Sequence, residues 1–145
     1  MITIETSIVI NRPVEDVWKF ISTWENFPQW DRGLVEVTQT SEEPTGVGST
    51  LQSVRLFLGL RGVGALWVSE YEPNKILAVK GSEGPIAGHI SFTFEPVEGG
   101  TQLTETREVE LGGLTRLMAP IIRPTQERQG RSDLAKVKRI LEAPA

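Results

Sequence analysis

The chain has 145 residues, a formal net charge of −4, one histidine and no cysteine. A chain of this length is expected to form one domain, residues 1–145, with a sizeable core. The lack of cysteine excludes disulfides and thiolate metal sites, and a single histidine excludes a histidine-rich cluster, so we expect no metal and no cofactor. The net negative charge argues against nucleic acid as a partner.

The first residues predict a strand followed by two short helices. Residues 2–10, ITIETSIVI, are β-branched and nearly alternate, which is typical of a strand. Pro13 suits the first turn of a helix, and Val14, Val17, Trp18 and Ile21 then form one apolar stripe. A second short helix is expected to start near Trp24 and to end at Pro28, because proline interrupts a helix.

The middle of the chain predicts a meander of about six strands, and the end predicts one long helix. The expected strands are residues 34–40, 50–58, 63–71, 75–81, 89–96 and 101–111, separated by short turns that favour antiparallel pairing. Residues 114–141 are expected to form a helix bent at Pro120 and Pro124. Two apolar stripes of this helix, around Leu117 and around Leu134, would reach the same sheet only if it bends.

Several segments together resemble the START-like (SRPBCC) superfamily, in its polyketide cyclase/dehydrase-type branch. They are SIVINRPVEDVWKFISTWENFPQW, the turn PTGVGS, EYEPNKIL, FTFEPVEGGTQLTET and the closing DLAKVKRILE. The resemblance implies an α+β helix-grip fold: a curved antiparallel sheet around a long C-terminal helix, with two short helices after the first strand. It also implies a cavity between the sheet and that helix, but no single activity, because the superfamily includes carriers, receptors, enzymes and co-chaperone-like domains.

Three of the four tryptophans lie between residues 18 and 30, and this concentration predicts an aromatic plug at one end of the curved sheet. Trp18 lies on the helical core stripe, whereas Trp24, Phe27 and Trp30 surround a proline and are candidates to line a ligand cavity. The remaining expected ligand-binding residues are apolar side chains of the strands and the last helix: Phe57, Trp67, Phe92, Leu117, Met118 and Ile121.

Charged residues on an expected inward strand face are the candidates for chemistry. If Leu103 and Val109 face the core, the two-residue period places Glu105 and Arg107 on the same face, and Arg55 raises the same question. Such charges would form a buried ion pair, act as polar groups in a wet cavity, or reach solvent at a bulge. His89 is expected to face outward, away from the core.

These observations leave three hypotheses about function. The first is a cytoplasmic protein, with no transmembrane segment and no signal peptide, that binds a small hydrophobic lipid-, aromatic- or polyketide-like molecule. The second is a cyclase or dehydratase that uses Glu105 as acid or base and Arg107 or Arg55 to orient an enolate. The third is a co-chaperone-like protein-interaction domain without a ligand.

Overall fold

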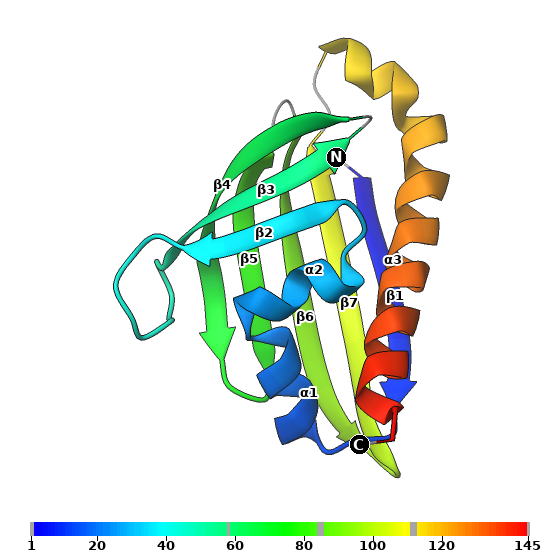
Figure 1. The fold of residues 1–145 in the computed structure, drawn as a ribbon. Helices are drawn as coiled ribbons and strands as arrows, with labels where there is room; N and C mark the ends of the chain where they lie inside the picture. Colours follow the sequence, from blue (N-terminus) through cyan, green and yellow to red (C-terminus); the bar gives the residue numbers. More distant parts are fainter. Residues whose placement is uncertain (1, 58, 84–85, 111–112, 145) are drawn as a thin grey trace.

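A single curved antiparallel sheet of seven strands organises the computed structural model, which describes residues 2–57, 59–83, 86–110 and 113–144 (Figure 1). The strand order is β1-β7-β6-β5-β4-β3-β2, so consecutive strands from β2 to β7 are neighbours and β1 returns beside β7. The strands are β1 (Ile2–Ile10), β2 (Leu34–Gln39), β3 (Thr50–Phe57), β4 (Leu60–Glu72), β5 (Ile76–Glu83), β6 (Ile86–Val97) and β7 (Gly100–Glu110).

Helical segments lie between β1 and β2 in the sequence and follow β7. They are α1 (Val14–Ile21), η1 (Trp24–Asn26), α2 (Phe27–Trp30), η2 (Gly113–Met118) and α3 (Ala119–Glu142). The helix-grip fold predicted from the sequence is therefore confirmed: a curved sheet, short helices after the first strand and a long C-terminal helix. The connection between β3 and β4 is shorter than predicted, because β4 begins at Leu60 rather than at residue 63.

The inner face of the sheet carries the core, and the first half of β7 shows the two-residue period of burial. Thr101, Leu103 and Glu105 are buried, and their neighbours on this strand are more exposed. The apolar stripe of α1 packs onto this face through Val17, Trp18 and Ile21, as the spacing predicts.

The long helix α3 runs beside β1 at one margin of the sheet (Figure 1). Leu134 and Val137 are buried in the main core, whereas Leu117 and Ile121 are 77% and 63% exposed. The expectation that a bend would bring both apolar stripes onto the sheet is therefore wrong. Ala119 and Ile122 instead make the contact near the helix start, against a small cluster formed by Ile2 and Ile4.

Gly130 allows α3 to approach the strands closely. A Cβ atom at this position would lie 2.9 Å from Thr6 Oγ1 and 3.5 Å from Glu105 Oε1. Such distances leave little room for a larger side chain, so the glycine fixes where the helix crosses the strands. Among the helices that the structure describes, none is long and apolar enough to cross a membrane.

Side chains of α3 satisfy backbone groups along β1, one of the two edge strands of the sheet. Lys138 Nζ donates to the Val9 carbonyl at 2.7 Å, and Arg123 Nη1 donates to the Thr3 carbonyl at 3.4 Å. Just after the strand, the Asn11 amide donates to Glu142 Oε2 at 2.8 Å. The helix thus covers β1 with polar contacts as well as with apolar packing.

Candidate functional site

The aromatic residues between positions 18 and 30 form a buried plug, as the composition of this segment suggests. Trp24, Phe27 and Trp30 are all buried, and Trp30 is only 1% exposed. Their rings follow one another, with centroids 5.5 Å apart between Trp24 and Phe27 and 4.9 Å apart between Phe27 and Trp30. Trp18 lies apart from this row and packs edge-on against Tyr71.

Phe92 of β6 links the aromatic plug to the polar part of the interior. Its ring meets Trp30 at right angles with a centroid distance of 5.7 Å, and its backbone pairs with that of Glu105 on β7. Trp24 Nε1 donates to Gln39 at 3.1 Å. The indole N–H of Trp30 has no acceptor among the described residues.

The other expected ligand-binding residues do not join this group. Trp67 lies in a cross-strand row with Lys80, on the opposite face of the sheet from Leu66 and Val68, and is 46% exposed. Leu117, Met118 and Ile121 are exposed at the start of the C-terminal helical segment. The side chain of Phe57 lies outside the described part of the structure, so its role stays a prediction.

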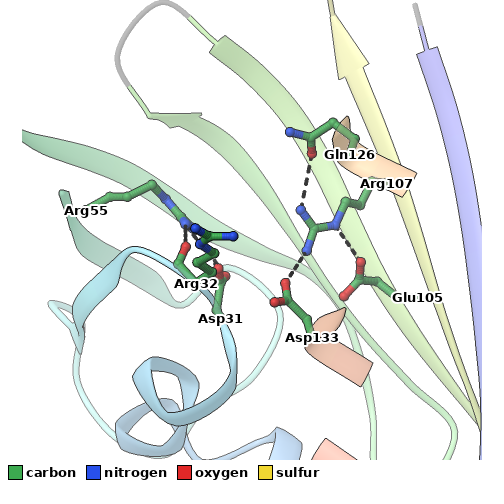
Figure 2. Close-up of polar contacts among 7 residues, drawn as sticks. All are labelled: Asp31, Arg32, Arg55, Glu105, Arg107, Gln126 and Asp133. Carbon is green, nitrogen blue, oxygen red and sulfur yellow. Dashed lines mark hydrogen bonds and ion pairs between the residues drawn. The ribbon is translucent and has the colours of Figure 1, made fainter. Parts of the chain in front are cut away.

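Arg107 is the centre of a buried charged cluster (Figure 2). Its Nε donates to Glu105 Oε1, its Nη2 donates to Asp133 Oδ2 at 3.0 Å, and its Nη1 donates to Gln126 Oε1 at 3.3 Å. The side chains of Glu105 and Asp133 are 1% and 0% exposed, and that of Arg107 is 12% exposed. Two strand residues and two helix residues are thus tied together inside the molecule.

Arg55 belongs to a second ion pair on the same side of the sheet (Figure 2). It grips both carboxylate oxygens of Asp31, at 3.0 and 3.2 Å, and also donates to the backbone carbonyl of Arg32 at 2.9 Å. Gly33, with φ +85°, turns the chain here, and an added Cβ would lie 3.2 Å from the Leu56 carbonyl. Arg55 therefore anchors the loop that follows α2, whereas Glu105 pairs with Arg107.

Burial controls the ionisation of the cluster. Desolvation raises the pKa of Glu105, and the Arg107 charge only partly offsets this. Desolvation, followed by the charge of Asp31, raises the pKa of Asp133 to about 7, although Arg107 lowers it. Burial alone would lower the pKa of Arg107, but the charges of Glu105, Asp31 and Asp133 and the hydrogen bond to Glu105 together outweigh burial, so the pKa is raised. A carboxyl group with a pKa of about 7 can both give and take a proton near neutral pH.

Several buried polar side-chain atoms lack a hydrogen-bond partner among the described residues. They include Glu105 Oε2, Ser53 Oγ and the Trp30 indole nitrogen. Asp133 Oδ1 also lacks one, although the backbone amide of Arg32 is close enough to lower the pKa of that carboxyl. Because buried polar groups in proteins are nearly always hydrogen-bonded, these unpartnered atoms are exceptions that call for an explanation.

Sequence reasoning found Glu105, Arg107 and Arg55 but missed the acids that face them. Asp133 had a detectable signal, because Gly130, Asp133, Leu134 and Val137 follow helical spacing on one face of α3 and are all buried. An acidic residue and a glycine within an apolar stripe indicate that this face of the helix contacts another part of the protein rather than solvent. Among the described residues, no group of three histidine, cysteine or acidic side chains is placed to hold a metal ion.

The curved sheet, the helical plug and the charged cluster under α3 define a helix-grip protein with a partly polar interior. The chain belongs to the family described as "Polyketide cyclase / dehydrase and lipid transport", whose model matches residues 1–142. This confirms the resemblance drawn from the sequence segments. No curated protein matches the sequence significantly.

Solved structures with the same fold cover almost the whole chain at low sequence identity. TTHA0849 from Thermus thermophilus has 15% identity and a TM-score of 0.79, with 97% of each chain covered. The Zhui aromatase/cyclase from Streptomyces sp. R1128 has 14% identity and a TM-score of 0.79, covering 97% of this chain and 93% of that one. BexL, a di-domain ARO/CYC of the BE-7585A biosynthetic pathway, has 15% identity and a TM-score of 0.79 over 99% of this chain and 51% of that one.

Proposed function

We propose that this protein binds a small hydrophobic molecule, lipid-, aromatic- or polyketide-like, between the inner face of the sheet and α3. The observation that carries the proposal is the set of unpartnered buried atoms, above all Glu105 Oε2 and the Trp30 indole nitrogen, beside an apolar aromatic wall. A ligand of this class has an apolar body for the rings and a few polar groups for those atoms. The name of the family is consistent with such a ligand.

Different residues would contact the apolar body of the ligand and orient its polar groups. Trp24, Phe27 and Trp30 would contact the apolar body, because aromatic side chains supply a large contact area. Arg107 would present its guanidinium to a carbonyl, phenolate or carboxylate of the ligand, and such charged hydrogen bonds are the strong ones. Glu105 and Asp133 would accept hydrogen bonds from hydroxyl groups.

A fluorescence titration with 1-anilinonaphthalene-8-sulfonate tests the proposed interior site. We expect saturable quenching of tryptophan emission that is strongly reduced in the Trp24→Phe/Trp30→Phe double variant. It should persist in Trp67→Phe, because Trp67 lies on the other face of the sheet. If the double variant quenches like the parent, or if Trp67→Phe alone abolishes quenching, the interior site is wrong.

The contribution of Arg107 can be measured in the same titration. Arg107→Met should weaken binding of the anionic probe by about 1.5–3 kcal/mol, the range for a charged hydrogen bond, or about 10- to 150-fold. Arg123→Met, which removes an exposed arginine, is the matched control and should change the affinity less than about twofold. Native mass spectrometry of freshly purified protein would reveal a ligand retained from the cell.

A second candidate function is a cyclase or dehydratase, and the raised pKa of Asp133 favours it. With a pKa of about 7 beside a guanidinium, this carboxylate would remove a proton from a carbon between two carbonyl groups, and Arg107 would stabilise the resulting enolate. The enolate carbon would attack another carbonyl carbon of the same substrate molecule. The oxygen of that carbonyl would take up the proton, which gives an alcohol. Loss of water from the resulting alcohol would complete the dehydration.

Incubation with a linear poly-β-ketone thioester distinguishes catalysis from binding alone. Cyclisation leaves the mass unchanged and dehydration lowers it by one water, so mass spectrometry and absorbance follow the two steps. Asp133→Asn should lower the rate by about 10²–10⁴-fold, the usual contribution of a general base. If the parent protein binds the thioester but converts it no faster than the uncatalysed reaction, binding alone would remain as the function.

A further inference from the structure

The outer face of the sheet, opposite the charged cluster, contains a groove of about 910 Å³. It extends across β3 to β7, and its lining includes Gln52, Val63, Trp67, Lys80 and Glu110. This volume falls within the range of about 300–1,000 Å³ that small-molecule sites occupy. The groove shares no polar side chain with the interior cluster, so it does not depend on the function proposed above.

Two cross-strand rows explain the shape of the groove. Ala65, Ser82 and Ala87 are register partners on β4, β5 and β6, and their small side chains form a low floor. Trp67 and Lys80, partners two residues further along the strands, stand beside that floor. Alternation along the strands places both rows on the same face, so the larger row forms a wall along the smaller one.

Trp67 is the largest apolar side chain in the lining of the groove. It is 46% exposed, whereas Trp18, Trp24 and Trp30 are 9% exposed or less. This indole lies on a central strand, next to a floor of small side chains, and leaves about half of its surface open to a ligand. Aromatic rings stack on such a surface, and an indole face also attracts cations.

The end of the groove on β7 is acidic. Glu108 and Glu110 contribute two negative charges to the lining, Lys80 contributes one positive charge, and the net charge is −1 with His89 neutral. His89 is placed between neighbours, with Nδ1 3.7 Å from Glu108 Oε2 and Nε2 3.5 Å from Ser69 Oγ. Lys80 is exposed, so its ammonium group can extend into water while its methylene stem covers apolar surface.

We propose that this groove binds a flat aromatic cation, with its rings against Trp67 and the small-residue floor and its cationic nitrogen beside Glu108 and Glu110. The half-exposed indole accounts for the aromatic part of the ligand, and the acidic β7 end accounts for its charge. Trp67 on β4 and Glu108 on β7 belong to one cross-strand row and are three strands apart, about 14 Å at about 4.8 Å per strand, so the long axis of the ligand would lie along this row. An anionic ligand is disfavoured at the same end.

Proflavine, a fluorescent three-ring cation, tests this proposal through fluorescence polarisation at physiological salt. Trp67→Ala, Ala87→Leu and the double variant Glu108→Gln/Glu110→Gln should each weaken binding at least tenfold. Glu95→Gln, an exposed acid on β6 outside the groove lining, is the charge control and should stay within twofold of the parent. Anthracene-9-carboxylate, flat but anionic, should bind at least tenfold more weakly than proflavine.

Other results would overturn the assignment. If Trp67→Ala and Ala87→Leu bind proflavine as tightly as the parent protein, the dye binds outside the groove. If Arg107→Met no longer binds proflavine, the dye occupies the interior site. If Ala87→Leu instead converts a dimer into a monomer in sedimentation velocity, the groove is an interface between two copies of the chain. Because the variants alter exposed or partly exposed side chains, unchanged thermal melts should accompany the expected losses of affinity.

Discussion

Arg107→Met is the substitution whose effect on stability follows most directly from the structure. The change keeps an unbranched side chain of similar reach but removes the guanidinium between Glu105 and Asp133. Those carboxylates are 1% and 0% exposed, so water cannot replace the lost charge without opening the interior. The free energy of unfolding should therefore fall by about 3–5 kcal/mol, the usual cost of breaking a buried ion pair from one side.

Neutralising the stranded acids should restore part of this loss. Glu105→Gln added to Arg107→Met removes one uncompensated charge, and Asp133→Asn added to both removes the second. Each step should raise the free energy of unfolding above that of Arg107→Met alone, so the single effects will not add. Because the three residues are in direct contact, we expect coupling energies of about 1–3 kcal/mol.

Urea unfolding at pH 7, followed by circular dichroism, measures the free energy of unfolding of the whole series. A decrease of about 3–5 kcal/mol in this free energy corresponds to a fall of about 10–20 °C in melting temperature. Arg123→Met is the control, because it breaks an exposed pair with Glu127 in which the side chains are 51% and 40% exposed. It should cost less than about 1 kcal/mol. If Arg107→Met costs no more than this control, or if the effects simply add, the cluster is not a desolvated unit.

Three further predictions concern α3. Because burial raises the pKa of Asp133 from 3.8 to about 7, the unfolded chain loses this proton first, and the free energy of unfolding falls as the pH rises from about 4 to about 7. The urea midpoints at pH 5 and pH 8 should therefore differ less in Asp133→Asn than in the parent protein. An unchanged difference would contradict the raised pKa. Gly130→Ala should destabilise the parent by about 1–3 kcal/mol through crowding of Thr6, but should be neutral or stabilising in a Thr6→Ala background, where the gain in helix propensity remains; thermal melts of the four proteins decide this. Leu134→Ala should cost about 2–5 kcal/mol while Ile140→Ala, at 37% exposure, costs less than half as much, and equal losses would show that Leu134 is not the buried contact.

Local patterns predicted the elements of this fold well, because each strand and helix follows from a spacing that neighbouring residues share. Residues 2–10 and the stripe of α1 are found where alternation and helical periodicity place them. The inward direction of Glu105 and Arg107 also follows from the two-residue period, and the structure pairs them with each other. These inferences need only the geometry of one element at a time.

Contacts between distant segments were beyond that reasoning. Asp133 meets Arg107 across 26 positions of sequence and Asp31 meets Arg55 across 24, so no local pattern links the partners. Trp67 was expected to line the interior, yet it faces outward because β4 has its own alternation, with Val68 inward. The helix was expected to hold the sheet along its whole length, but Leu117 is directed to solvent and Ala119 makes the contact instead.

The polar contacts between α3 and β1 have a consequence for the behaviour of the molecule in concentrated solution. An open strand margin pairs readily with the margin of another molecule, which leads to ordered aggregation. Here the ammonium of Lys138 occupies the Val9 carbonyl and the guanidinium of Arg123 approaches the Thr3 carbonyl, so a foreign strand would have to displace both. Loosening of the helix would expose this strand, so α3 opposes self-association through the β1 edge of the sheet.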